Sequence, residues 1–361
     1  MNRIRTTTTI TTLGLIAMMM AGCASGASSA AEGTPDAGGP SVSELRLGYF
    51  ANVTHAPALV GLQEGIFAKD LGDVDVTTQV FNAGPAAIEA LTAGAIDATY
   101  IGPNPSINTF IQSGGESARI IAGAATGGAA LVVADGIDSP KDLKGTTLAS
   151  PQLGNTQDVA LRVWLEDQGY TTDTSGGGDV SVTPTENAQT LTLFQQGTIQ
   201  GAWLPEPWVS RLVVDAGAHV LQDEADLWPD GQFPTTVLLV RADFLKDHPD
   251  VVEHLLQGHV DSVQWIADHP DQVADVVNAQ LEKDTGKGLS DAVIDRALEH
   301  VTFSADPHAD TFETLVANGL KAGTQKKGSI DGLFDLRLLN GILQKSGADP
   351  VSAAGLGEDS P

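Results

Sequence analysis

Residues 146–164 read TTLASPQLGNTQDVALRVW and combine a short apolar segment, a loop of small residues and an amphipathic segment. We expect a buried strand at 147–149, a loop at 150–155 and a helix capped by Asn155 or Thr156. A helix start of this kind leaves backbone N–H groups unpaired, and the helix dipole adds positive partial charge there. The unit therefore predicts an anion site without basic side chains. The alternative is an ordinary βα turn, and the composition of the other loops distinguishes between the two.

The same design recurs along most of the chain. Apolar segments with strand character alternate with helical segments through residues 45–134 and again through 139–208, which predicts βα units around largely parallel sheets. Residues 91–98 match residues 194–201 in position and type, which indicates two similar lobes. After a further strand at 235–241, residues 244–343 show helical periodicity.

These patterns predict an α/β protein with two doubly wound lobes joined by a two-strand hinge. Lobe 1 comprises residues 43–134 and 236–350, with its helical C-terminal extension packed on it, and lobe 2 comprises residues 135–235. The chain then crosses between the lobes near 134–138 and near 232–236, and in hinged molecules of this kind the ligand lies in the cleft. Residues 351–361 are rich in Ala, Gly and acidic side chains, and we expect a flexible tail.

The N-terminal residues indicate export. Arg3 and Arg5 precede an apolar run at 13–20 and small residues before Cys23, the single cysteine of the chain. We interpret residues 1–22 as a lipoprotein signal peptide with Cys23 as the lipidated residue; the alternative is a Sec signal cleaved nearby beside an incidental cysteine. Residues 23–42 are a Ser-, Ala-, Gly- and Pro-rich flexible tether. The expected location is the outer face of the cytoplasmic membrane.

The charge and the absence of certain sequence motifs argue against nucleic acid as a partner, against a metal site and against an enzyme. A net charge of −27 and a pI near 4.3 argue against nucleic acid, which requires clustered Lys and Arg. Four histidines between 248 and 269 lack the spacing of a closed metal site, so we expect no metal and no cofactor. The sequence also lacks a nucleophile elbow, a phosphate loop ending in Gly-Lys and a paired His–Glu motif, so we do not expect an enzyme.

The loops that follow the predicted strands gather at one edge of each lobe, where ligands bind in doubly wound folds. None of these loops contains Lys or Arg. They offer neutral donors and helix starts, each worth about 0.3–1 kcal/mol when exposed, which suits a monoanion better than a nucleotide. The candidate ligand-binding residues are Asn52, His55, Asn82, Asn104, Thr126, Asn155, Thr156, Gln157, Trp203 and Glu206.

Several candidates also have an ordinary structural interpretation. His55 precedes the helix-starting Pro57 and is as readily a satisfied structural histidine. Trp203 is either lobe packing or a cleft wall, and Trp208 is lobe packing. Glu206 is favourable at a helix start in any case, but it would receive the ammonium group of a zwitterionic ligand such as taurine.

The motifs along residues 44–280 resemble the solute-binding lipoproteins of ABC importers for nitrate, alkanesulfonates, taurine and bicarbonate. The residues that carry the resemblance are Gly48-Tyr49, His55-Ala56-Pro57, Gly65-Ile66-Phe67, Ala90-Leu91, 94–98, 102–105, 142–145, 154–158, 205–208 and 244–249. The resemblance implies a type II periplasmic-binding fold that closes on a small anion. It also implies a monomer that hands its ligand to a membrane permease with a cytoplasmic ATPase.

The resemblance leaves the ligand open. An aliphatic sulfonate or taurine is our first choice, because a neutral site rich in helix starts suits a monoanionic head group. Nitrate, bicarbonate and a thiamine-precursor pyrimidine are alternatives in the same role, and a tethered ligand sensor is an alternative role. The similar thiamine-pyrimidine synthases carry a Cys-rich motif, whereas this chain has only Cys23.

Overall fold

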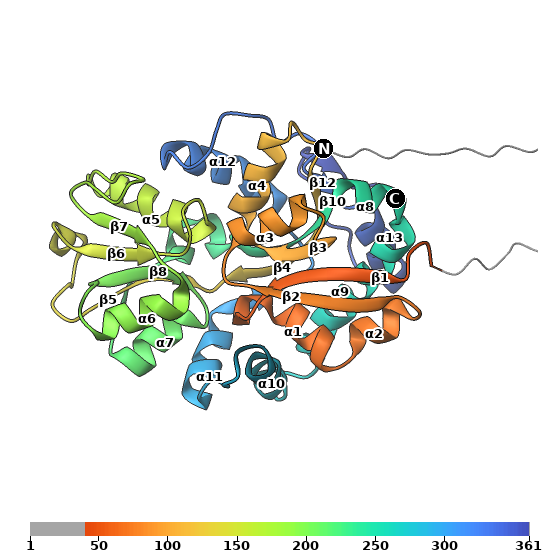
Figure 1. Cartoon of the computed structure of the whole chain (residues 1–361), viewed down its shortest axis with the longest axis horizontal. Helices are drawn as coiled ribbons and strands as arrows, with labels where there is room; N and C mark the ends of the chain where they lie inside the picture. The colour runs from red at the N-terminus through yellow and green to blue at the C-terminus, as the bar shows by residue number, and fades with distance from the viewer. Residues whose placement is uncertain (1–39, 361) are drawn as a thin grey trace, which may run out of the picture. The chain divides into compact units, whose positions relative to one another are not determined.

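The computed structural model describes residues 40–360, which fold around two β-sheets (Figure 1). The predicted signal peptide, Cys23 and most of the tether lie outside the described residues. In these residues the alternating strand and helix pattern is present as the sequence predicts, and the fold is mixed α/β.

The first sheet has the strand order β13-β12-β4-β10-β3-β1-β2, with β11 paired to β4. Strand β1 is parallel to β2 and β3, whereas β10 runs antiparallel between β3 and β4. Leu45, Leu47 and Tyr49 of β1 are buried, as their alternation predicts. The strands of this sheet are β1 (Glu44–Phe50), β2 (Asp75–Phe81), β3 (Ala98–Ile101), β4 (Ala118–Gly127), β10 (Pro234–Arg241), β11 (Val301–Phe303), β12 (Phe334–Asp335) and β13 (Gly357–Glu358).

The second sheet has the strand order β7-β6-β8-β5-β9. Strand β6 is parallel to both of its neighbours, and β5 is antiparallel to β8 and β9. The strands are β5 (Ala129–Val133), β6 (Thr147–Ser150), β7 (Ser181–Pro184), β8 (Gly201–Pro205) and β9 (His219–Asp223). The β6 strand and the helix that follows it are the unit predicted from residues 146–164.

Helices cover both faces of the sheets. Lobe 1 contains α1 (Ala56–Gln63), α2 (Ile66–Leu71), α3 (Gly84–Thr92) and α4 (Pro103–Gln112), and lobe 2 contains α5 (Thr156–Asp167), α6 (Asn187–Gln195) and α7 (Trp208–Ala216). Each lobe has its own apolar core, which lies on both sides of the sheet in lobe 2. Short 3-10 turns lie at Val53–His55, Pro140–Leu143, Glu224–Leu227, Pro229–Gly231 and Ala309–Thr311.

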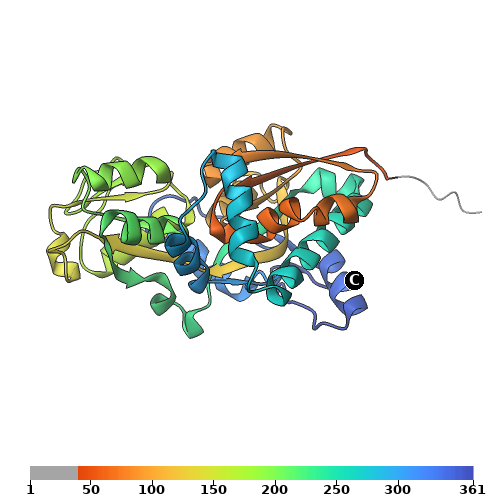
Figure 2. The same cartoon turned by 90° about the horizontal axis from the view of Figure 1, so that it is seen from below.

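The C-terminal helices contact both lobes. They are α8 (Ala242–Asp247), α9 (Pro249–Asp268), α10 (Val273–Thr285), α11 (Asp291–Glu299), α12 (Phe312–Lys321) and α13 (Arg337–Ser346). Helices α9 and α10 pack on α1 and α2 of lobe 1, as Figure 2 shows from below, and α13 packs on α9. However, α11 also packs on α7, and α12 on α5, so the extension reaches lobe 2 as well.

The first crossing between the lobes lies earlier than the sequence analysis predicts. Strand β5 belongs to the second sheet, so the chain leaves lobe 1 at Gly128, not near 134–138. Gly127 and Gly128 both have positive φ, 75° and 69°, and this sharp backbone turn suits glycine. The second crossing follows β9 and ends at β10, close to the predicted 232–236.

The predicted flexible tail is packed over most of its length. Strand β13 pairs with β12, and the side chains of Ala353 and Leu356 are buried in the core of lobe 1. The small-residue composition of 351–361 suggested fraying, but two apolar side chains and a short parallel strand pair outweigh it. Pro361 lies outside the described residues.

Candidate functional site

A small chamber of about 20 Å³ lies between the two lobes, near the starts of several helices. That volume accommodates about one water molecule. The lining comes from the loops after β1, β2 and β3 in lobe 1 and from those before α5 and α6 in lobe 2. The lining residues are Phe50, Asn52, Thr54, His55, Asn82, Gly102, Asn155, Gln157, Asn187, Pro205 and Thr235.

The helix starts around the chamber have no side-chain caps. The residues that precede α3, α4 and α5 are Ala83, Gly102 and Asn155, and none of their side chains caps its own helix. Instead, the Gly84 N–H at the start of α3 donates to Asn155 Oδ1 across the cleft, at 3.1 Å. An amide oxygen of lobe 2 thus occupies an acceptor position at a helix start of lobe 1, which is where an anionic oxygen is favoured.

Five of the predicted residues line this chamber: Asn52, His55, Asn82, Asn155 and Gln157. Two of them also join the lobes. Trp208 Nε1 donates to Asn52 Oδ1 at 2.9 Å, and Asn82 Nδ2 donates to Glu186 Oε1 at 3.4 Å. The structure therefore brings half of the ten predicted ligand-binding residues together at one interlobe surface.

His55 is a neutral member of the chamber wall. Burial lowers the pKa of His55 to about 3. The Phe50 N–H donates to His55 Nδ1 at 3.2 Å, and the Phe50 ring stacks on the imidazole at a centroid distance of 4.5 Å. Because Nδ1 accepts a hydrogen bond, the ring proton is on Nε2. His55 thus offers a neutral donor and no positive charge.

Asn104 and Thr156 are buried close to the chamber without lining it. Within residues 40–360, neither Asn104 Oδ1 nor Thr156 Oγ1 has a hydrogen-bond partner, although Asn104 Nδ2 donates to the Leu315 carbonyl at 3.4 Å. Asn187 Oδ1, which does line the chamber, is also unpartnered. Buried polar atoms are normally satisfied, so these three oxygens indicate a place for water or for a ligand group; the two amide oxygens require a donor, whereas the Thr156 hydroxyl can also donate.

Trp203 is not a cleft wall. Its side chain is fully buried in the core of lobe 2, at a centroid distance of 5.9 Å from Trp164. Its Nε1 donates to Glu224 Oε2 at 2.7 Å. An inward-facing position on the central strand β8 explains this burial, since alternate residues of a strand face opposite sides.

Glu206 and Thr126 also lie away from the chamber. Glu206 is buried and accepts hydrogen bonds from the Ser210 N–H at 3.0 Å, from Ser210 Oγ at 2.9 Å and from Arg296 Nη1 at 3.0 Å. Arg296, from α11, takes the place that the sequence analysis left for a ligand ammonium. Thr126 Oγ1 donates to the Thr302 carbonyl at 3.5 Å between β4 and β11.

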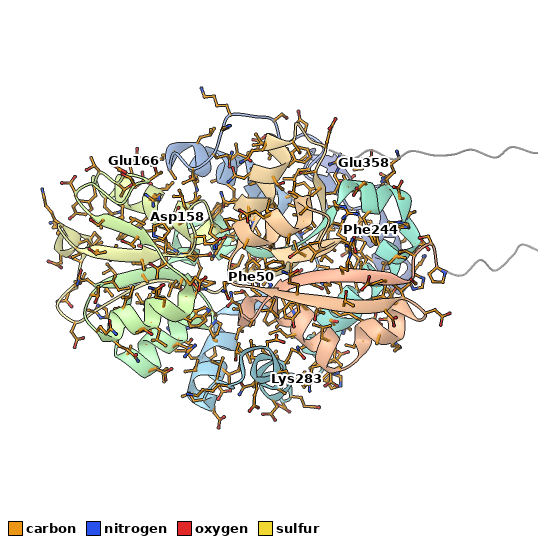
Figure 3. All side chains as sticks on the ribbon, viewed as in Figure 1. Phe50, Asp158, Glu166, Phe244, Lys283 and Glu358 are labelled. Atoms are coloured by element: carbon orange, nitrogen blue, oxygen red, sulfur yellow. The ribbon has the colours of Figure 1, made fainter. Side chains whose placement is uncertain are left out.

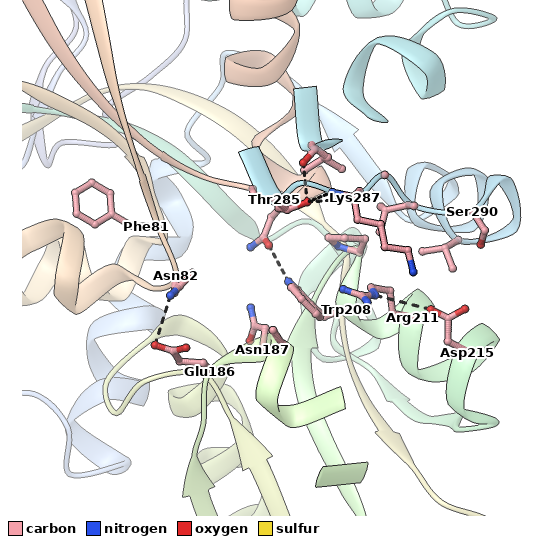
Figure 4. Close-up of a pocket in the computed structure, with 18 residues that line it drawn as sticks. Phe81, Asn82, Glu186, Asn187, Trp208, Arg211, Asp215, Thr285, Lys287 and Ser290 are labelled. Carbon is pink, nitrogen blue, oxygen red and sulfur yellow. Dashed lines mark hydrogen bonds and ion pairs between the residues drawn. The ribbon is translucent and has the colours of Figure 1, made fainter. Parts of the chain in front are cut away.

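A larger pocket of about 610 Å³ adjoins the chamber, and sequence reasoning missed it (Figure 4). It shares Asn52, Asn82 and Asn187 with the chamber. Its other walls include the aromatic Phe81 and Trp208, together with the charged Glu186, Arg211, Asp215 and Lys287. Arg211 lies one turn beyond Trp208 on α7, a helical spacing that would have placed it on the same face. No pattern in the sequence predicts that the loop between α10 and α11 lies at this cleft.

Within residues 40–360, no group of three or more His, Cys, Asp or Glu side chains has the arrangement of a metal site. The helices found there are all too short or too polar to cross a membrane.

Comparison with known proteins identifies the family. Residues 38–280 match the model of the NMT1-like family. A binding protein of Brucella abortus is 27% identical over 259 residues, which cover 68% of this chain and 77% of that protein. The taurine-binding periplasmic protein of Escherichia coli is 28% identical over 215 residues, covering 60% and 64% of the two chains.

The solved structures agree on the fold. The alkanesulfonate-binding protein SsuA of Xanthomonas axonopodis, bound to MOPS, superposes with a TM-score of 0.65 at 19% identity, over 79% of this chain and 95% of that one. The periplasmic-binding fold expected from the sequence is thereby confirmed. Because the family match extends over well more than half of the chain, the protein belongs to the NMT1-like family and is a solute-binding protein of the ABC-import type, not an enzyme.

Proposed function

We propose that this protein captures a small organic oxyanion between its lobes and delivers it to a membrane permease driven by a cytoplasmic ATPase. An aliphatic sulfonate or taurine is the first choice. The observation that supports the proposal most directly is the interlobe chamber, where neutral amides of both lobes meet three helix starts without side-chain caps. Such a site suits a monoanion, because it offers donors and helix dipoles without basic side chains.

The ligand oxygens would replace an existing contact between the lobes. Asn155 Oδ1 accepts from the Gly84 N–H, and a sulfonate oxygen at that position would receive the same hydrogen bond. Thr156 and Gln157 lie in the first turn of α5, where further N–H groups point out of the helix. A chamber of about 20 Å³ is too small for a sulfonate, so binding requires the lobes to move apart.

The relatives favour the same ligand class without fixing it. The Escherichia coli relative is named for taurine, and the structural neighbour for alkanesulfonate. For taurine, Glu206 is already paired with Arg296, so the carboxylate that remains near the chamber is Glu186, which accepts from Asn82. Nitrate, bicarbonate and a thiamine-precursor pyrimidine are the alternatives in the same role, and sensing is the alternative role.

Calorimetric titration tests the proposal. The panel comprises taurine, a plain alkanesulfonate, nitrate, bicarbonate with and without calcium, and a thiamine-precursor pyrimidine. We expect a sulfonate to bind at least tenfold more tightly than nitrate or bicarbonate, a difference of about 1.4 kcal/mol. If the pyrimidine alone binds, or no anion binds, the assignment to oxyanions is wrong while the fold is unaffected.

We also propose that the protein is anchored through a lipid on Cys23 at the outer face of the cytoplasmic membrane. The basis is the sequence alone: a basic start, an apolar run too short for a span, and small residues before the single cysteine. Replacing Cys23 by Ala should move the protein from the membrane fraction to the soluble extracytoplasmic fraction. Unchanged membrane association would refute the anchor.

A further inference from the structure

The pocket that adjoins the chamber is much larger than a simple inorganic ion requires. Its volume is about 610 Å³, within the range of roughly 300–1,000 Å³ typical of sites for small organic ligands. Since one water molecule occupies about 30 Å³ in the liquid, nitrate or bicarbonate would fill only a small part of it. Asn52, Asn82 and Asn187 line both cavities, so one ligand can extend from the chamber into the pocket.

The far side of this pocket carries two cationic side chains. Arg211 stacks on the Trp208 ring at 4.6 Å, and within the described part of the chain its guanidinium has no side-chain hydrogen bond. Asp215 Oδ2 forms an ion pair with Arg211 Nε at 3.8 Å, which is longer than a hydrogen bond. Lys287 lies on the same side of the pocket, in the loop between α10 and α11, and no ion pair of its side chain occurs within residues 40–360 (Figure 4).

The charges of the pocket are separated along its length. Glu186 lies at the end next to the chamber, bonded to Asn82, whereas Arg211, Asp215 and Lys287 lie at the other end and together carry a net charge of +1 (Figure 4). Burial lowers the pKa of Arg211, and the negative charge of Asp215 only partly opposes this shift. The positive charge of Arg211 is therefore not fully neutralised by Asp215. Between the two ends, Asn187 lines both cavities, and its amide Nδ2 is the atom that can donate a hydrogen bond to an acidic group of the ligand.

We propose that the ligand is an organic dianion that is held at both ends. One acidic group, such as a sulfonate, binds at the helix starts of the chamber, and a second, such as a carboxylate, pairs with Arg211 and Lys287. The carbon chain between them lies along Trp208. The inference rests on the proposed capture of an oxyanion in the chamber, and it adds that the second acidic group determines specificity. A planar guanidinium suits this role because it binds carboxylates through two parallel hydrogen bonds.

Two matched ligands test the proposal: 1-propanesulfonate, and 3-sulfopropionate, which adds a terminal carboxylate to a chain of similar length. In calorimetric titrations of the purified protein, we expect 3-sulfopropionate to bind at least tenfold more tightly. Replacing Lys287 by Ala, or Arg211 by Gln, should each remove most of that preference and change the affinity for propanesulfonate less than twofold. Arg211→Gln also removes the guanidinium that stacks on the Trp208 ring, so Lys287→Ala is the cleaner test of the charge.

Lys283→Ala is the matched control for net charge. Lys283 is an exposed lysine on α10 that donates to Gln63 outside the pocket (Figure 3), so its removal should leave the preference for the dianion intact. Equal affinity for the two sulfonates would overturn the dianion proposal and leave the capture of oxyanions standing. Equal losses in Lys283→Ala and Lys287→Ala would show general electrostatics and also overturn it. If neither sulfonate binds and no other anion does, the proposed function itself fails.

Discussion

Removing Arg296 should destabilise the protein strongly, because the residue neutralises a buried carboxylate. Arg296 Nη1 is 3.0 Å from Glu206 Oε1 and 2.8 Å from Ser210 Oγ, which joins α11 to α7 of lobe 2. The Glu206 side chain is 1% exposed and that of Arg296 is 21% exposed. Burial raises the pKa of Glu206, while the hydrogen bonds from Ser210 and the positive charge of Arg296 lower it and so oppose part of this shift.

The size of the effect follows from this geometry. Breaking a buried pair by removing one partner costs about 3–5 kcal/mol, since an uncompensated charge remains. Because Arg296 reaches solvent, water can enter the vacated space, and we expect Arg296→Met to cost about 2–3 kcal/mol at pH 8. The cost should be smaller at pH 5, because protonation of Glu206 removes the uncompensated charge.

Urea unfolding at both pH values measures this, with Lys321→Met as the control. Lys321 also joins a C-terminal helix to lobe 2, through Asp167, but the two side chains are 33% and 58% exposed. A surface pair of this kind is worth about 1 kcal/mol or less. If Arg296→Met costs no more than Lys321→Met at pH 8, the buried pair does not stabilise the joint between α11 and lobe 2.

Three further predictions concern other parts of the molecule. Burial raises the pKa of Glu224 from 4.5 to about 7, so the folded state binds this proton more tightly than the unfolded state. The contribution of Glu224 to the unfolding free energy should therefore fall by about 3 kcal/mol as pH rises from 4.5 through 7. Glu224→Gln should remove this slope in urea titrations, and an unchanged slope would contradict the assignment. Gly84→Ala would place a Cβ 2.3 Å from Pro105 Cγ, and thermal unfolding should show a loss of about 1–3 kcal/mol, with no loss refuting the close packing of α3 on α4. Trp208→Phe removes the donor to Asn52 across the lobes, and its affinity for the ligand, measured by calorimetry, should change at least threefold if that bond forms in the bound state.

The fold was predictable because its local signals agree with one another. The stretch 146–164 is a strand, a loop and a helix as expected, and the repeated strand and helix pattern yields two sheets. The first crossing was misplaced because residues 125–128 and 134–138 both look like turns, and only strand pairing shows that β5 belongs to lobe 2. Burial of Ala353 and Leu356 was likewise invisible in a segment of polar and small residues.

The candidate site was predictable only in part. Asn52, Asn82 and Asn155 follow or precede elements whose ends meet at the cleft, so their positions follow from topology. Trp203 was wrong because it lies in the middle of β8 and faces an apolar core of lobe 2, and Glu206 was wrong because Arg296 of α11 pairs with it. Arg211 and Lys287 were missed because their contribution depends on how the C-terminal helices pack against lobe 2.

The most direct test of the central claim is the affinity of the double variant Asn155→Ala, Thr156→Ala for the sulfonate that binds the unaltered protein most tightly. Asn155 lines the chamber and accepts from Gly84, and the Thr156 hydroxyl is buried without a partner within the described chain. If an oxyanion binds at these helix starts, calorimetry should show at least a tenfold loss, about 1.4 kcal/mol. Unchanged affinity in a folded double variant would place the ligand elsewhere and contradict the account.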